Sequence, residues 1–236
     1  MAKAGKKYLN AVSLVDKAKY YEPLAAIELA KSAAFAKFDE SVEVSVKLGV
    51  EPEHADQMVR GSVLLPHGTG RVVRVLAFAK GDKAKEALTS GADYVGEEDL
   101  IAKVEGGWFE FDSVVATPDM MSKVSKIGKL LGTKGLMPNP KLGTVTNDLA
   151  GIIKQLKTGR VEFRTEKKAG NIHAIIGKRS FETAHLLINL KAFIDALIKL
   201  KPSASKGVYI RSVSISTTMG PGVKIDTAEL LQNLSA

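Results

Sequence analysis

The chain has 236 residues, of which 45% are hydrophobic, enough for one large domain or two modest domains with a real core. Its net charge of +8 favours a polyanionic partner such as nucleic acid. It contains no cysteine, which excludes disulfides, cysteine-ligated zinc and thiol nucleophiles. No apolar run approaches the roughly 18 residues of a membrane span, and the basic start lacks the apolar segment of a signal peptide. We therefore expect a cytoplasmic protein.

The first quarter of the chain has the pattern of a helix followed by a half-buried strand. Pro23 suits a first helical turn, and apolar residues follow it at helical spacing until the helix fades near Ala36. From residue 42 to residue 48, apolar residues alternate with the polar residues Glu43, Ser45 and Lys47. This alternation predicts a strand with one polar face. The Pro-His-Gly-Thr-Gly stretch at 66–70 then predicts a loop.

Strands and helices alternate in the middle of the chain. We predict a continuous apolar strand at 71–79, a short extended segment at 92–95 and an apolar strand at 114–116. The ranges predicted to be helical are 83–89, 99–104, 120–131 and 149–156. Buried strands that alternate with helices predict a parallel sheet covered by helices.

The pattern after Gly159 is again typical of antiparallel structure. Strands are predicted at 161–164 and 172–176, joined by a basic hairpin turn at 167–171. Ser180 is a suitable N-cap for the long apolar helix that follows. A last long strand is predicted at 208–216.

This last strand changes phase along its length. Val208 and Ile210 share one phase, whereas Val213 and Ile215 share the opposite one. A strand of period two cannot bury both pairs on one face. We therefore predict either a bulge near Arg211 and Ser212 or a strand covered on both faces.

The two ends of the chain resemble each other in pattern, and the middle differs from both. We expect a discontinuous α+β domain of residues 1–67 and 160–236, with an α/β domain of residues 68–159 inserted into it. Two crossings that contain glycine would join the domains. The predicted hinge residues are Gly68, Gly70, Thr158 and Gly159.

The sequence offers little for catalysis or metal binding. Its four histidines are scattered, without a ligand pair on one helix face: His54, His67, His173 and His185. The stretch at 128–135 lacks the glycine spacing of a phosphate loop and ends a helix. We expect no enzyme, no cofactor and no metal. A nucleotide-binding enzyme built on the inserted domain is the alternative.

Hydroxyl, glycine and basic residues point instead to RNA. The Ser-Thr-Thr-Met-Gly-Pro-Gly stretch at 216–222 can contact ribose and phosphate, and a surface turn is the simpler interpretation. Five lysines between 123 and 141 could also belong to a solvated helix face. More positive charge lies around the predicted hairpin, at Arg164, Lys167, Lys168, Lys178 and Arg179.

Several motifs follow one another along the chain: K-F-D-E-S-V-E at 37–43, V-R-G at 59–61, L-P-H-G-T-G at 65–70, G-K-L-L-G-T-K-G-L-M-P-N-P at 128–140 and S-T-T-M-G-P at 216–221. In this order they resemble the bacterial ribosomal protein L-one family. The resemblance covers essentially the whole chain. It implies a terminal-halves domain of split β-α-β type with an inserted Rossmann-like, three-layer α/β domain.

The resemblance also implies a non-enzymatic constituent of the large ribosomal subunit. Proteins of this family bind large-subunit rRNA at the mobile stalk near the E site, assist release of deacylated tRNA, and repress their own operon by binding its mRNA. The implied partners are therefore stalk rRNA, the operon's mRNA, E-site tRNA and other ribosomal components. The free protein is expected to be a monomer away from membranes. A general basic RNA chaperone is a further alternative.

Mapped by motif, the RNA contacts of the family fall in the terminal-halves domain. The positions are Lys37, Phe38, Ser41, Glu43, Lys47, Ser212, Thr218, Met219 and Gly220. To these we add the hydroxyl of Thr217 and the charges of Arg164, Lys167 and Lys168. Hydroxyls and open backbone would contact ribose 2′-OH groups and so distinguish RNA from DNA, while lysines supply salt-sensitive attraction.

Overall fold

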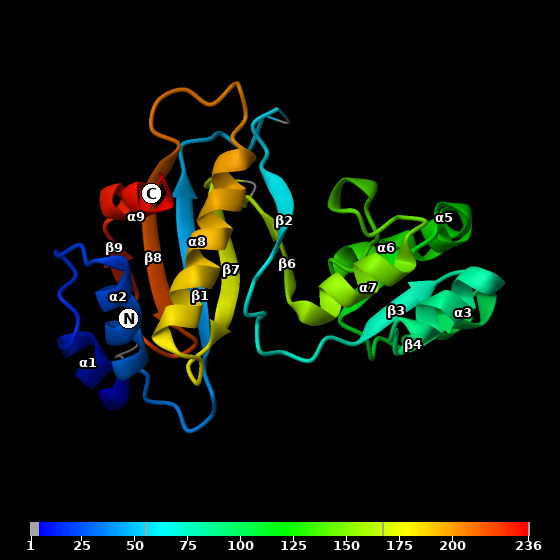
Figure 1. Cartoon of the computed structure of the whole chain (residues 1–236), viewed down its shortest axis with the longest axis horizontal. Helices are drawn as coiled ribbons and strands as arrows, with labels where there is room; N and C mark the ends of the chain where they lie inside the picture. Colours follow the sequence, from blue (N-terminus) through cyan, green and yellow to red (C-terminus); the bar gives the residue numbers. More distant parts are fainter. Residues whose placement is uncertain (1–4, 55, 167, 236) are drawn as a thin grey trace. The chain divides into compact units, whose positions relative to one another are not determined.

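A computed structural model describes residues 5–54, 56–166 and 168–235, with side chains as far as residue 232. By its internal contacts the chain divides into two compact units (Figure 1). Unit 1 comprises the residues up to Gly70 and those from Val161 onward. Unit 2 comprises Arg71–Arg160.

Unit 1 is built from helices and strands of the two terminal parts of the chain. The helices are α1 (Lys6–Ser13), α2 (Pro23–Ser32), α8 (Thr183–Lys199) and α9 (Thr227–Ser235). The strands are β1 (Ser41–Leu48), β2 (Arg60–Leu64), β6 (Arg160–Arg164), β7 (Asn171–Lys178), β8 (Ile210–Thr217) and β9 (Val223–Ile225).

Four of these strands form an antiparallel sheet in the order β7-β1-β8-β9. The valines of β1 are buried and the residues between them are half-buried or exposed, which confirms the predicted alternation. The valines pack in one core with apolar residues of α2 and α8. In Figure 1, α8 crosses in front of β7 and β1. One face of the sheet therefore builds the core, and the other carries the polar residues.

The predicted bulge in β8 is confirmed. Lys47 pairs with Ser212 and Leu48 with Ile210, so Arg211 is the extra residue. The bulge lets Ile210 and Val213 both reach the core, with exposed fractions of 5% and 1%. The strand begins at Ile210 and not at Val208, which is exposed.

The predicted hairpin between residues 161 and 176 needs a correction. The turn itself closes, because the Glu166 amide donates to the Asn171 carbonyl at 2.9 Å. However, β6 pairs with β2 in a separate two-stranded sheet, whereas β7 joins the four-stranded sheet. Alternation in the sequence identified both strands, but it carries no information on which partner each strand chooses.

The predicted N-cap of α8 was wrong. The helix begins at Thr183 with Glu182 at the cap position. Ser180 instead donates from its hydroxyl to Asp39 at 2.8 Å and from its amide to the same carboxylate at 3.1 Å. Asp39 therefore ties the loop before β1 to the loop before α8.

Unit 2 has the predicted alternation of strands and helices. Its elements are β3 (Val75–Phe78), α3 (Asp82–Thr89), β4 (Tyr94–Gly96), α4 (Glu98–Glu105), β5 (Ser113–Ala116), α5 (Met121–Val124), α6 (Gly128–Thr133) and α7 (Leu149–Thr158). The strands form a parallel sheet in the order β4-β3-β5, which confirms the predicted parallel arrangement. All four residues of β3 are buried.

The helix predicted at 120–131 is not continuous. It consists of α5 and α6 linked and preceded by single 3₁₀ turns, at Pro118–Met120 and Ser125–Ile127. Each piece keeps one apolar side chain in the core, including Met120, Val124, Ile127 and Leu131. The helical spacing was therefore right, and the breaks were not visible in it.

Candidate functional site

The polar face of the four-stranded sheet is the most distinctive surface of unit 1. Directly opposed residues of antiparallel strands point to the same side. Ser45 of β1 is opposed by Ser214 of β8 and His173 of β7, and Ser214 is opposed by Lys224 of β9. Neighbouring rows are built in the same way, from Glu43 with Ser216 and Ile175, and from Lys47 with Ser212 and Asn171.

This polar face, as we call it below, is rich in hydroxyl groups. Its serines are half-buried, so their hydroxyls lie at the surface: Ser41, Ser45, Ser212, Ser214 and Ser216. At a rise of about 3.3 Å per residue, β1 extends the face over roughly 20 Å from Ser41 to Lys47. Acidic charge is sparse, and Glu43 is the acidic residue among these positions.

One end of the polar face is closed by the turn after β8. The amide of Thr218 donates to the Ser41 carbonyl at 3.0 Å, and the Ser41 amide donates back to the Thr218 hydroxyl at 3.0 Å. Lys178 donates from its ammonium to the Ser41 hydroxyl at 2.9 Å. These contacts join the start of β1, the end of β7 and the end of β8, and therefore bring together the two motifs predicted to form the site.

A buried carboxylate anchors the same end. Glu40 is 0% exposed. Its two carboxylate oxygens accept hydrogen bonds from the Ala36 amide at 2.7 Å and from the Met219 amide at 3.0 Å. Its carbonyl accepts from the Arg179 amide at 2.8 Å. Glu40 thus holds the loop before β1, the turn after β8 and the end of β7 in one arrangement.

The environment of Glu40 keeps it ionised. Burial by itself raises the pKa of this carboxyl, since it removes water from the charged form. The amides of Met219 and Ala36, with the Thr217 hydroxyl, outweigh burial, and the pKa is lowered from 4.5. Glu40 lies inside the motif at 37–43, but its role could not be predicted, because nothing in a sequence marks a glutamate as buried.

The turn around Glu40 presents large apolar side chains to solvent. Phe38 is 56% exposed and Met219 is 49% exposed, and Lys37 beside them is also exposed. Gly220 lies so close to Thr217 that a Cβ atom would come within 2.4 Å of its hydroxyl. A side chain at Gly220 would therefore displace this turn.

The other end of the polar face contains Lys47 and Ser212, which oppose each other. The exposed Lys168 lies in the turn that leads into β7. Arg164 lies on β6, in the two-stranded sheet, and its guanidinium donates to the Met58 sulfur. Lys167 lies outside the described residues.

Two predicted contacts need correction in their detail. Thr217 is 3% exposed and opposes Val42, so its side chain lies on the core side of the sheet and is not available to a ligand. The Thr218 hydroxyl is engaged with the backbone of Ser41 on both sides, as acceptor at 3.0 Å and as donor at 3.3 Å. Both threonines therefore hold the turn in place through contacts inside the protein.

Comparison with known proteins assigns the chain to a family. The profile of the Ribosomal protein L1p/L10e family matches residues 29–221. The chain belongs to this family. It is accordingly a non-enzymatic, RNA-binding protein of the large ribosomal subunit.

In this ribosomal protein, the crossing near Gly68 is fixed by a buried polar side chain. Asn189 of α8 is 0% exposed. Its amide group donates to the carbonyls of Gly68 and Ile176 at 2.9 and 2.8 Å, and its oxygen accepts from the His67 amide at 3.0 Å. The predicted core positions of α8 are apolar, and sequence reasoning missed Asn189 among them.

Three of the four predicted hinge residues are glycines in a backbone conformation that other residues rarely adopt. Gly68, Gly70 and Gly159 have φ angles of 65°, 69° and 125°. Thr158 is the last residue of α7. At Gly70 a Cβ atom would also come within 3.0 Å of Phe181, so glycine is required there for two reasons.

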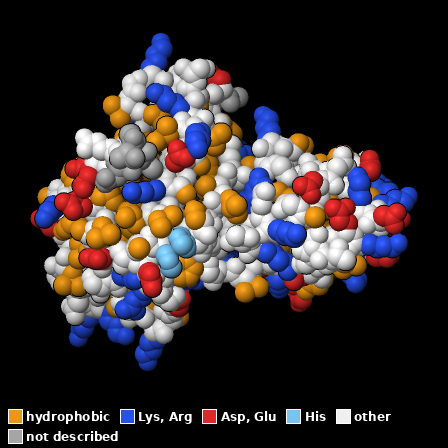
Figure 2. All heavy atoms as spheres, in the orientation of Figure 1, with side chains coloured by type: hydrophobic (Ala, Val, Ile, Leu, Met, Phe, Trp, Pro, Cys, Tyr) orange, Lys and Arg blue, Asp and Glu red, His pale blue; other side chains and the backbone are white. Residues whose placement is uncertain are grey.

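On the face of this ribosomal protein that Figure 2 shows, basic and acidic side chains are interspersed. Lys123 pairs with Glu98 at 2.6 Å, and Lys134 lies 4.0 Å from the centre of the Phe109 ring. Part of the lysine series in unit 2 is therefore committed to local contacts.

Two of the histidines meet, contrary to their scatter in sequence. The rings of His67 and His185 stack at 3.9 Å. Within the described ranges no group of three or more histidine, aspartate or glutamate side chains is placed to hold a metal ion. Across the same residues, no helix is long and apolar enough to cross a membrane.

Proposed function

We propose that the polar face of unit 1 binds large-subunit rRNA at the mobile stalk, near the E site. The observation that carries the proposal is a set of three neighbouring cross-strand rows, each with a half-buried serine of β8 and two of them with a lysine. Hydroxyl side chains both donate and accept hydrogen bonds, as ribose 2′-OH groups do. A face of this kind suits the wide, shallow minor groove of A-form RNA.

The two ends of the face have different parts in this proposal. At the Glu40 end, Phe38 and Met219 pack on bases or ribose, and Lys37 contacts phosphate. The backbone of Gly220 approaches the RNA closely, because it carries no side chain. At the other end, Lys47, Lys168 and Arg164 attract the phosphate chain, and Ser212 hydrogen-bonds to it.

Glu43 is the position that requires an explanation in an RNA site. Its side chain stands between Ser216 and Ile175 in the middle rows of the face. A carboxylate accepts hydrogen bonds from a 2′-OH or from a base amino group and repels phosphate. We propose that Glu43 sets the register of the RNA and adds little to affinity.

We further propose that units 1 and 2 are separate domains, of split β-α-β and Rossmann-like type, joined by a hinge at Gly68, Gly70, Thr158 and Gly159. Glycine occupies three of the four positions, each with a positive φ angle, and Asn189 holds the unit 1 side of the first crossing. Hinge motion would let the protein follow the mobile stalk while it assists release of deacylated tRNA from the E site.

Regulation of the operon follows from the same face in this proposal. If the mRNA of the operon folds into an element like the stalk, both RNAs compete for one surface. Free protein then binds mRNA and represses translation only when rRNA is saturated. A competition titration tests this step: stalk RNA should displace labelled leader mRNA completely and with a single affinity.

The binding face is tested by a charge placed at the exposed Met219. Met219→Asp should weaken binding to folded stalk RNA by about tenfold or more, since its carboxylate would face phosphate. Leu24→Asp is the matched control, because Leu24 is exposed to a similar degree, 46%, but lies in α2 on the helical side of the sheet. Equal affinities of the two variants in filter binding would refute the assignment.

The same titration separates specific binding from general RNA chaperone activity. A specific protein should retain stalk RNA in the presence of excess unrelated structured RNA. Loss of the complex at equal mass of competitor would favour the chaperone.

A further inference from the structure

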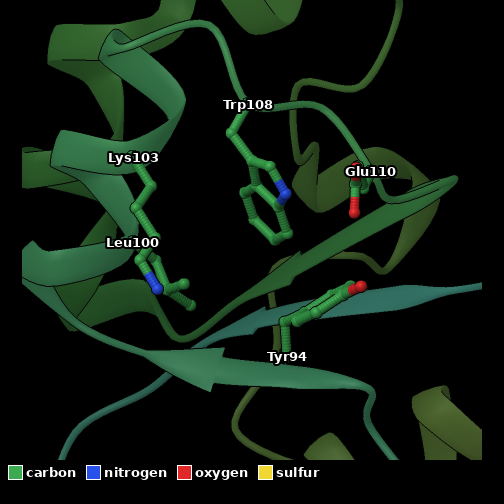
Figure 3. Close-up of a pocket in the computed structure, with 5 residues that line it drawn as sticks. All are labelled: Tyr94, Leu100, Lys103, Trp108 and Glu110. Carbon is green, nitrogen blue, oxygen red and sulfur yellow. The ribbon is translucent and has the colours of Figure 1, made fainter.

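Unit 2 contains a surface cavity of about 450 Å³ at the edge of its parallel sheet. The lining residues come from three neighbouring segments (Figure 3): Tyr94 of β4, Leu100 and Lys103 of α4, and Trp108 and Glu110 of the segment before β5. The Trp108 amide donates to the Lys103 carbonyl at 3.1 Å. This bond folds the segment back against α4 and fixes the wall that carries the tryptophan.

The aromatic walls of the cavity are held rigidly. The rings of Tyr94 and Trp108 meet edge to face, with centres 4.7 Å apart and an interplanar angle of 89°. Behind them Trp108 contacts Phe111, which is 3% exposed and part of the core. Tyr94 and Trp108 themselves are only half-buried. They therefore present fixed π surface to a ligand at little entropic cost.

The polar side chains of the cavity carry opposite charges on opposite sides. In Figure 3, Lys103 and Glu110 lie on either side of Trp108. Both are exposed, and within the described residues the Lys103 ammonium makes no ion pair. The acidic Glu98 at the start of α4 is paired with Lys123 and does not pair with Lys103. A complementary ligand has an apolar planar body, an anionic group on one side and hydrogen-bond donors on the other.

We propose that this cavity binds one unstacked nucleotide of single-stranded RNA. The base packs on Trp108 and Tyr94, the phosphate pairs with Lys103, and the exocyclic amino group of adenine or cytosine donates to Glu110. This contact is separate from the polar face of unit 1. The choice of RNA over a basic peptide rests on the RNA-binding role of the family and on Lys103, which would repel an arginine.

The chain provides its own probe for this site. Trp108 is the single tryptophan among the 236 residues, so intrinsic tryptophan fluorescence reports on the cavity alone. Titration of the full-length protein with tetra-adenylate should quench this fluorescence with saturation, because a base that stacks on the indole quenches it. Tetra-uridylate, which lacks an exocyclic amino group, should bind about threefold or more weakly.

Three variants assign the roles. Lys103→Ala should weaken tetra-adenylate binding about threefold or more and reduce the dependence on salt. Glu110→Gln should narrow the difference between adenylate and uridylate, because glutamine both donates and accepts. Lys129→Ala is the matched control, since it removes an exposed lysine of α6 outside the cavity. It should leave the titration unchanged.

The outcomes separate this proposal from the proposed function. Met219→Asp should leave the quenching by tetra-adenylate intact even where it weakens stalk RNA binding. Absence of saturable quenching up to millimolar tetra-adenylate would overturn the proposal. Quenching by tetra-arginine without quenching by RNA would overturn it in favour of a peptide site. If Lys103→Ala bound tetra-adenylate with unchanged affinity, the proposed contact between Lys103 and the phosphate would be excluded.

Discussion

The four-stranded sheet of unit 1 and the three-stranded sheet of unit 2 differ in how their strands are buried. In β1 of unit 1 every second residue is buried, whereas in β3 of unit 2 all four are. The antiparallel sheet is covered on one face and leaves the other polar. The parallel sheet has helices on both faces, because each connection between parallel strands must cross over.

This difference determines what each unit can offer to a ligand. A half-covered sheet provides a broad, rigid platform on which opposed side chains repeat at the spacing of the strands. A fully covered sheet provides only its edges and connecting loops, such as the cavity beside β4. We therefore expect unit 1 to bind an extended RNA surface and unit 2 to bind at most a local feature.

The largest expected loss of stability comes from removing Glu40, which anchors one end of the polar face. Glu40→Ala removes the acceptor of the Ala36 and Met219 amides and should reduce the free energy of unfolding by about 3 kcal/mol. Urea denaturation measures this loss. Glu43→Ala is the control on the same strand, because Glu43 is half-buried on the polar face. If both variants were equally stable, Glu40 would not be the anchor.

A smaller loss of stability is expected from a change at Asn189, which holds the segment near Gly68 where the chain leaves unit 1. Asn189→Leu keeps the side-chain size but leaves two carbonyls and the His67 amide without their partner. The free energy of unfolding should fall by about 2 kcal/mol. Hydrogen exchange should speed up at the His67 amide before it does so in β1. Unchanged protection at His67 would contradict the role of Asn189.

A steric test concerns the turn after β8. Gly220→Ala should displace the turn, because its Cβ would lie 2.4 Å from the Thr217 hydroxyl, and should cost about 1 kcal/mol. Gly222→Ala is a matched control two residues away, where a Cβ meets nothing within 4 Å. Thermal unfolding of the pair should show a lower Tm for Gly220→Ala only. Equal Tm values would show that the turn accommodates the methyl group.

The smallest expected effect is a pH dependence from Glu40. Its pKa is lowered by folding, so the folded protein binds its proton less readily than the unfolded chain. The stabilisation is fully present above the ordinary pKa of 4.5 and is lost as the pH falls through the lowered value. Denaturation curves between pH 6 and pH 3 should therefore converge for the wild type and Glu40→Gln. If the stabilities of the two proteins instead changed in parallel with pH, the stabilisation would not depend on the ionisation of Glu40.

Much of this architecture could be predicted from periodicity. The alternation at 42–48 predicted β1, and the phase change in β8 left a bulge near Arg211 and Ser212 as one of two alternatives, which the structure confirms. These features are local, and the pattern of buried residues expresses them directly. The division into antiparallel and parallel sheets followed from the spacing of helices and strands.

The contacts that position the site could not be predicted from the sequence. Glu40 and Asn189 are buried polar residues whose partners are backbone groups of distant segments. Backbone donors and acceptors occur at every residue, so no pattern reveals which one a side chain will meet. For the same reason Thr217 was assigned to the ligand, although one position along the strand places it on the core side.

The central claim is that RNA binds on the polar face of unit 1. It is tested most directly by a negative charge in the centre of that face, at Ser214, which lies between Ser45 and Lys224. The control is the same substitution at the exposed Ser122 in α5 of unit 2. Filter binding with folded stalk RNA should show about tenfold or more loss of affinity for Ser214→Glu and little change for Ser122→Glu. Equal affinity of Ser214→Glu and the wild type, with the fold intact by circular dichroism, would contradict the account.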